Sequence, residues 1–153
     1  MEDLVHYDMG GMSLESLRRA KDRAAQLGLR LPVVEGGPPI DRIVLNKEGC
    51  DKQIEDYKEA LGIMGKLGVK VLCDNFMPQL TKDAMVMRTS FSTSERGGAL
   101  TSSFDLARFD NDRLIDEGVT SDEKVWDHLD YFLGQIIPAA EENNVLLVRK
   151  PRK

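Results

Sequence analysis

The segment that most constrains the fold is residues 69–78, VKVLCDNFMP, which indicates a buried strand that stops abruptly. Its valines suit a pleated backbone, in which side chains alternate between two faces. Pro78 has no N–H to donate, so the strand has to end before it. Asp74 and Asn75 therefore lie at the carboxyl end of the predicted strand, where α/β folds place their chemistry. We expect a functional site there, and we expect Cys73 to point into the core with the valines.

The composition is that of one globular domain, and it argues against several classes of function. The 153 residues are 31% charged and 41% apolar, with a net charge of −5. An acidic chain does not predict nucleic-acid binding, and no apolar run is long enough to span a bilayer. Cys50 and Cys73 are too few for a disulfide framework, and the acidic start does not resemble a signal peptide. We therefore expect a cytoplasmic protein that binds neither nucleic acid nor membrane.

Predicted helices and strands alternate along the chain. Residues 1–12 show no periodicity and are interpreted as an irregular lead-in, so the domain is expected over residues 13–153. Apolar residues recur three and four positions apart in three stretches, which predicts helices. The helices are expected at about 14–27, 51–67 and 121–142, and the strands at 29–35, 69–74 and 145–148. Helices between strands require parallel pairing through right-handed crossovers.

Individual residues fix the ends of these helices. Ser13 is expected as the N-cap of the first helix, and Gly28 and Gly68 are expected to end the first and second helices. In the third helix we expect Trp126 to face inward. We expect Pro138 to bend the helix or to start a new turn, because it removes one backbone hydrogen bond.

A long insertion, about residues 79–118, separates the central strand from the third helix. Two β-prone runs within it, residues 85–91 and 99–104, flank the turn sequence ERGG and predict a β-hairpin. The predicted fold class is therefore α/β, with about three parallel strands, crossover helices and a hairpin insertion. A complete (β/α)8 barrel needs about 250 residues, so the pattern predicts a partial TIM barrel.

The sequence VLCDNFMP resembles the mannonate dehydratase family, in which the third barrel strand ends in Cys-Tyr-Asn-Phe-Met-Pro. Residues 28–35 are similar to the family's second strand, which ends in a glutamate. Residues 88–105 are similar to its inserted hairpin, and residues 136–141 to the helix before its fourth strand. The resemblance covers about residues 13–148. It implies the N-terminal part of a xylose-isomerase-like TIM barrel, and we expect a truncated relative.

The resemblance also implies a function. The family is a group of lyases that remove water from D-mannonate, giving 2-keto-3-deoxygluconate in glucuronate catabolism, with manganese or another divalent cation as cofactor. It implies a sugar acid as substrate and places Asn75, Glu35 and Arg88 in contact with it. Each also has a structural interpretation. Asn75, like Asp74, can cap the strand end, Glu35 can be a solvated loop residue, and Arg88 can be an exposed residue of the hairpin.

The chain departs from the family where the family binds metal. Lys150 stands in place of a histidine ligand, and an ammonium group cannot coordinate a cation without losing its proton. The family's other ligands lie on later strands, and Asp74 replaces the family's tyrosine. His6 and His128 are interpreted as surface residues, because no partner at ligand spacing accompanies them. We therefore assign no catalytic and no metal-binding residue, and we expect the chain to be inactive alone.

Two further hypotheses remain open at this point. The chain can be a non-catalytic half-barrel that forms a homo-oligomer through its open sheet edges, or a gene fragment without a function of its own. A closed barrel has no edges, whereas a piece of one has two. We therefore expect apolar side chains of the sheet to be exposed.

Overall fold

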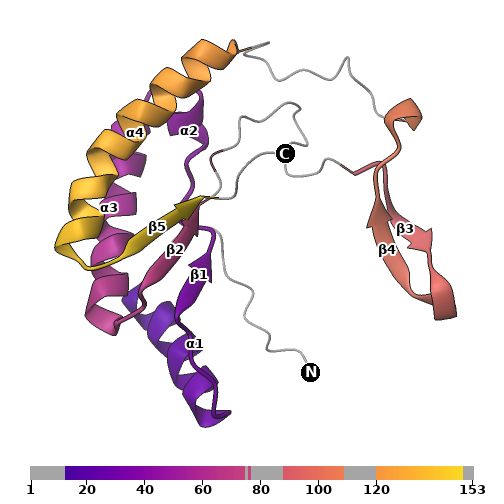
Figure 1. The fold of residues 1–153 in the computed structure, drawn as a ribbon, viewed down its shortest axis with the longest axis horizontal. Helices are drawn as coiled ribbons and strands as arrows, with labels where there is room; N and C mark the ends of the chain where they lie inside the picture. Colours follow the sequence, from indigo (N-terminus) through magenta and orange to yellow (C-terminus); the bar gives the residue numbers. More distant parts are fainter. Residues whose placement is uncertain (1–12, 75, 77–87, 109–119, 150–153) are drawn as a thin grey trace. The chain divides into compact units, whose positions relative to one another are not determined.

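A computed structural model of the chain describes residues 13–74, 76, 88–108 and 120–149 (Figure 1). The predicted lead-in, Asn75 and Lys150 lie outside these residues. The chain divides into two compact units. The first is formed by Met1–Pro78 with Asp122–Lys153, and the second by Gln79–Ser121.

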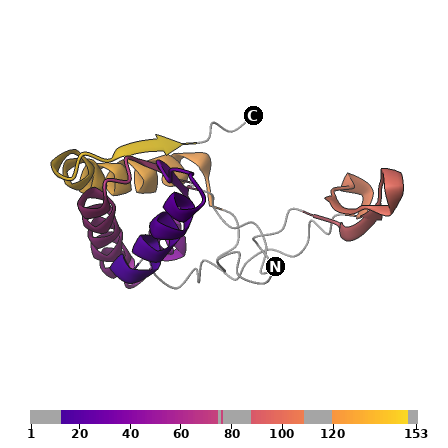
Figure 2. The ribbon, with the colours of Figure 1, turned by 90° about the horizontal axis from the view of Figure 1, so that it is seen from below.

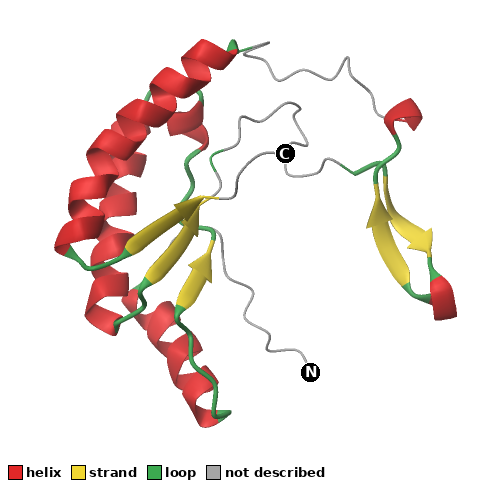
Figure 3. Ribbon diagram, viewed as in Figure 1, coloured by secondary structure: helices red, strands yellow, loops and turns green. Residues whose placement is uncertain are grey.

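The first unit consists of a parallel three-stranded sheet with helices on one face (Figures 1 and 3). The strands lie in the order β1, β2, β5, so that β2 is central. Figure 2 shows α1 and α3 grouped together in the helical layer. The bounds are β1 Val33–Glu35, β2 Val71–Asp74, β5 Leu146–Arg149, α1 Leu14–Gln26, α2 Asp41–Val44, α3 Cys50–Leu67 and α4 Asp122–Glu142. This confirms the predicted fold class of a partial barrel with crossover helices.

The register of the sheet brings the carboxyl ends of the three strands to one edge. The strands at Val33 and Val71 are adjacent and parallel, as expected; Val33 lies opposite Val71, and Glu35 lies opposite Cys73. On the other side of β2, Asp74 lies opposite Arg149. The last residues of all three strands therefore form one rim, and this rim is where a candidate site has to be sought.

The helix ends follow the predicted signals. Ser13 caps α1, because its hydroxyl accepts a hydrogen bond from the Ser16 amide at 3.1 Å. After α1, Gly28 takes a left-handed conformation with φ of 70°. The amides of Gly28 and Leu29 donate to carbonyls of the last turn of α1, which is the Schellman arrangement that favours glycine here. Gly68 ends α3 in the same conformation.

The core lies between the sheet and the helices. Aromatic rings form the part of it that lies near the carboxyl end of β2. Phe132 of α4 is completely buried and meets the ring of Tyr57 edge-on, with centroids 5.0 Å apart. It also stacks on Phe76, just beyond β2, at 5.8 Å. Because one ring contacts both α3 and the end of the central strand, it fixes the position of α4 over the sheet.

Two strand predictions need correction. The strand expected from Leu29 begins only at Val33, because Pro32 has no N–H and only its carbonyl joins the sheet, accepting from the Val71 amide at 3.1 Å. Cys73 does not point into the helix-covered core. Leu72 and Asp74 are buried beneath the helices, so the alternation of the strand places Val71 and Cys73 on the opposite face, where they are half-buried.

Corrections also apply to the helices. The single-turn helix α2 was not predicted; the amides of Arg42 and Ile43 donate to the Gln53 side-chain oxygen at 3.0 and 3.3 Å. Trp126 is 66% exposed instead of facing inward. His128 is half-buried, and its Nδ1 lies 2.8 Å from the Val44 carbonyl, so it connects α4 to α2. Pro138 lies inside α4, which continues through it to Glu142.

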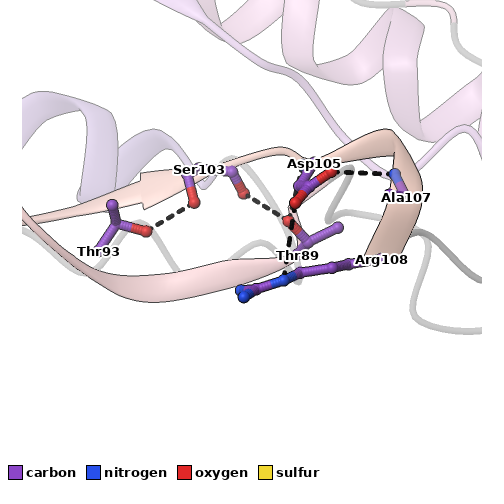
Figure 4. Close-up of polar contacts among 6 residues, drawn as sticks. All are labelled: Thr89, Thr93, Ser103, Asp105, Ala107 and Arg108. Carbon is purple, nitrogen blue, oxygen red and sulfur yellow. Dashed lines mark hydrogen bonds and ion pairs between the residues drawn. The ribbon is translucent and has the colours of Figure 1, made fainter.

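The described part of the second unit contains the predicted hairpin, but its first strand begins at Ser90 and continues beyond the predicted end at residue 91. Strands β3 (Ser90–Ser94) and β4 (Leu100–Ser103) pair antiparallel through the short 3-10 turn η1 (Arg96–Gly98). Figure 4 shows the polar contacts that hold it and the following turn η2 (Leu106–Arg108). The hydroxyls of Thr93 and Ser103 are 2.6 Å apart, and the amide of Asp105 donates to the Thr89 hydroxyl at 2.8 Å.

The contact of Gly65 in α3 with the turn after α4 gives a test of this packing. A Cβ atom at Gly65 would lie 2.7 Å from the backbone carbonyl oxygen of Asn143. Gly65→Ala is expected to lower the free energy of unfolding by about 1–3 kcal/mol, because the backbone has to move. Urea denaturation followed by circular dichroism measures this change.

Gly62→Ala is the matched control, one turn earlier on the same helix. Its Cβ would meet the Asn143 side chain at an ordinary 3.8 Å. This substitution is expected to raise stability by about 0.5–1 kcal/mol through helix propensity. Equal effects of the two substitutions would contradict the packing of α3 on this turn.

Candidate functional site

The candidate site is the rim formed by the carboxyl ends of β1, β2 and β5 (Figure 1). The strands bring three charged residues to this edge of the sheet: Glu35, Asp74 and Arg149. Their side chains leave the sheet on different faces, because the alternation of each strand decides the side. Asp74 is buried on the side that the helices cover, and Glu35 is exposed.

Asp74 and Arg149 form a largely buried ion pair across the top of the sheet. The Arg149 Nη2 donates to the Asp74 Oδ2 at 2.6 Å, and Asp74 is only 5% exposed. The guanidinium carbon also lies 5.3 Å from the centroid of the Phe76 ring, which favours a cation–π contact. The pair joins the ends of β2 and β5, and it keeps the Asp74 carboxylate occupied.

Tyr57 of α3 lies beneath this ion pair. Burial raises the pKa of its hydroxyl far above the ordinary value, and the negative charge of Asp74 raises it further, while Arg149 opposes the shift. Its hydroxyl lies near the Asp74 carboxylate but makes no hydrogen bond of ordinary geometry among the described residues. A Cβ atom at Gly37 would lie 3.0 Å from the Tyr57 ring, so the loop after β1 closes over it. Tyr57 therefore stays neutral and cannot act as a base.

The structure places one of the three predicted substrate-binding residues on the rim. Glu35 is exposed at the end of β1, opposite Cys73. Arg88 belongs to the second unit, where its Nε donates to the Ser102 hydroxyl at 3.1 Å. Asn75 lies outside the described residues. The contacts of these residues with a substrate stay predictions.

Sequence reasoning missed Arg149 and Tyr57 as members of this cluster. Arg149 follows three apolar residues of a predicted strand, and Asp74 ends the neighbouring strand with the opposite charge. Opposite charges at the ends of adjacent parallel strands are a signal that could have indicated the pair. Tyr57 gave no comparable signal, because its place in the helical pattern shows only that it is buried.

The described residues do not fit a divalent cation. Such a site needs several oxygen or nitrogen ligands that converge, and no group of three or more His, Cys, Asp or Glu residues is arranged to hold a metal in the part of the chain that the structure describes. Asp74 is paired with Arg149, and His128 contacts the Val44 carbonyl.

A groove lies beside β5, the last strand of the sheet among the described residues. It has a volume of about 390 Å³ and runs between β5 and the second half of α4. Most of its lining is apolar, with Glu141 and Arg149 as charged members besides Asp74.

None of the described helices is long and apolar enough to cross a membrane.

Comparisons with known proteins agree on one family. The family model described as D-mannonate dehydratase (UxuA) matches residues 4–119. The mannonate dehydratase of Shouchella clausii is 30% identical over 169 residues, covering 90% of this chain and 46% of the relative. That of Thermotoga petrophila is 31% identical over 176 residues, with the same coverage. The chain thus spans less than half the length of these relatives.

A solved structure shows the same likeness in three dimensions. The crystal structure of mannonate dehydratase from Streptococcus suis serotype 2 matches with a TM-score of 0.73 at 29% sequence identity. The match covers 94% of this chain and 41% of that chain.

The ion pair at the rim can be tested by a double-mutant cycle. Arg149→Met leaves the Asp74 carboxylate buried without a partner and is expected to lower the free energy of unfolding by about 3 kcal/mol. Combining it with Asp74→Leu is expected to recover most of this loss, because both charges are then removed. Urea denaturation of the wild type, both single variants and the double variant gives the coupling free energy.

The exposed pair of Lys52 and Asp56 on α3 is the control. Lys52→Met is expected to leave stability unchanged, because water screens that pair. Additive effects of Asp74→Leu and Arg149→Met would contradict the pairing across the rim.

Proposed function

Because the chain belongs to the D-mannonate dehydratase family, we propose that it contributes the substrate-binding rim of a barrel that dehydrates D-mannonate. We propose further that the chain by itself binds the sugar acid without turning it over. The observation that supports this most is the parallel sheet whose strands end together, with the Glu35 carboxylate exposed at that edge. The match to the family over residues 4–119 supports the same substrate.

Three residues would share the recognition of the sugar acid. Glu35 would accept hydrogen bonds from substrate hydroxyls, and Asn75 can both donate and accept them. Arg88, which belongs to the second unit, stays a prediction as the residue that binds the substrate carboxylate in a bidentate manner. The proposal includes the pathway and the location of this reaction: it would belong to glucuronate breakdown and would take place in the cytoplasm.

The chemistry explains why binding alone is proposed for this chain. Dehydration of a sugar acid requires removal of a weakly acidic proton beside the carboxylate and loss of a hydroxide. A divalent cation, manganese in our expectation, would stabilise both charges when bound. Among the described residues Asp74 is neutralised by Arg149 and Tyr57 is locked in its neutral form. These residues therefore offer neither a metal site nor a base beneath the rim.

A second candidate function is that of an assembly module. The sheet face opposite the helices carries Val33, Leu146 and Val148, which are 45%, 67% and 46% exposed. This confirms the expectation that apolar side chains of the sheet are exposed. Exposure of such apolar surface to water is unfavourable. A half-barrel that buries this surface against another polypeptide would therefore be more stable.

The first test is binding and turnover of D-mannonate by the purified chain. We expect binding in the millimolar range, seen by NMR titration, and no formation of 2-keto-3-deoxygluconate with or without manganese. Glu35→Gln is expected to weaken binding about tenfold, because a carboxylate accepts stronger hydrogen bonds than an amide. Glu59→Gln, an exposed carboxylate on α3, is the control and should change nothing. Turnover of D-mannonate would contradict the proposal, and so would an affinity for D-mannonate that is the same in the wild type and in Glu35→Gln.

The second test concerns manganese. We expect calorimetric titration to show no binding in the micromolar range, because three or four converging ligands are needed for a tight site. Micromolar binding that disappears in Glu35→Gln would show that the rim holds metal, and the proposal of an inactive chain would then be wrong.

A further inference from the structure

The loop that follows β1 rests on the aromatic ring of Tyr57. A Cβ atom at Gly37 would lie 3.0 Å from the Cε2 of this ring and 3.3 Å from its Cζ and its hydroxyl oxygen. Carbon atoms in ordinary contact are about 3.5–4.0 Å apart. Gly37 does not take a left-handed conformation, so its backbone would accept other residues. The contact with the ring is therefore what favours glycine at this position.

The ring of Tyr57 is held too firmly to move away from the loop. Tyr57 is completely buried, and the ring of Phe132 meets it edge-on with centroids 5.0 Å apart. Phe132 is also completely buried, and it stacks on Phe76 at 5.8 Å. A close-packed core of this kind resists displacement. A side chain added at residue 37 would therefore displace the loop, which is half-buried at Gly36 and Gly37.

The residues on the two sides of Gly37 direct this displacement toward Glu35. On one side Pro38 is buried, and its own ring fixes the backbone angle φ. On the other side Gly36 has a φ of 84°, and its amide donates to the Cys73 carbonyl at 3.0 Å. This hydrogen bond extends the pairing of β1 with β2 to the residue after Glu35. The more flexible side of the loop is thus the side that carries the Glu35 carboxylate.

We propose that Tyr57 is a positioning residue for Glu35. Its ring supports the loop at Gly37 and thereby keeps the Glu35 carboxylate where the sugar acid would bind. Tyr57 does not touch the substrate in this role, because it is completely buried. The inference rests on the proposed function, since Glu35 is the carboxylate that we propose to bind D-mannonate. A purely structural role would differ, because a change at Gly37 would then alter stability and leave Glu35 in place.

NMR of the chain tests the positioning without any substrate. In Gly37→Val we expect the amide signals of Glu35 and Gly36 to shift, and we expect the Gly36 amide to exchange about tenfold faster, because its bond to Cys73 is weakened. Gly37→Ala is expected to give smaller changes in the same direction, and it decides the question if the valine variant does not fold. Gly134→Val is the matched control, because Gly134 is exposed on α4 and its Cβ would meet nothing within 4 Å outside its own helix.

The affinity for D-mannonate then shows whether Gly37 acts through Glu35. Gly37→Val is expected to raise the dissociation constant about tenfold, as Glu35→Gln does. The double variant is expected to bind as weakly as either single variant and no weaker, because both substitutions remove the same interaction. Gly134→Val should bind like the wild type. A loss in the double variant equal to the product of the two single losses would overturn the positioning role.

The contrary outcomes separate this inference from the proposed function. Unchanged Glu35 and Gly36 signals in both Gly37 variants would overturn the support of Glu35 by the Tyr57 ring, even if D-mannonate binds. A wild-type chain that does not bind D-mannonate would overturn the proposed function. The amide signals would in that case still decide whether the ring holds Glu35 in place.

Discussion

The packing of Phe132 against Tyr57 and Phe76 is the interaction on which the rest of the structure depends. It holds α4 over the sheet and fills the space beneath the carboxyl ends of the strands. Because this space is filled by rings, the Tyr57 hydroxyl and the Asp74 carboxylate are buried beside one another. A buried carboxylate needs a partner, and Arg149 supplies it from the neighbouring strand. The charged top of the sheet is thus a consequence of the aromatic core.

The same packing shapes what the rim can do. A carboxylate that is bound to a guanidinium and covered by helices is not available to a cation or a substrate. Among the described residues at the strand ends, the exposed carboxylate is that of Glu35, on the open face of the sheet. The match to the mannonate dehydratase family is the reason why we propose that this face binds a sugar acid, and the ion pair beneath it is the reason why we propose binding without turnover.

Much of the fold could be predicted because local signals dominate it. Ser13, Gly28 and Gly68 fix helix ends through backbone geometry, and Val33 and Val71 indicate strands that only parallel pairing can join. Other features depend on tertiary contacts that have no local signal. Trp126 is exposed because Val125 and Leu129 take the positions nearer the core and leave it on the flank of α4. At the rim, Glu35 was anticipated, whereas the partner of Asp74 depends on strand register, which one sequence does not specify.

The central claim is that the three parallel strands, held by the aromatic core, form a folded unit. Hydrogen exchange of backbone amides measures this directly, since only stable pairing protects them. The Leu146 amide, bound to the Lys70 carbonyl, and the Val71 amide, bound to the Pro32 carbonyl, are the decisive positions. The account predicts that both exchange slowly, together with the amides of α3. Exchange at these amides as fast as in an unfolded chain, while α3 stays protected, would contradict it.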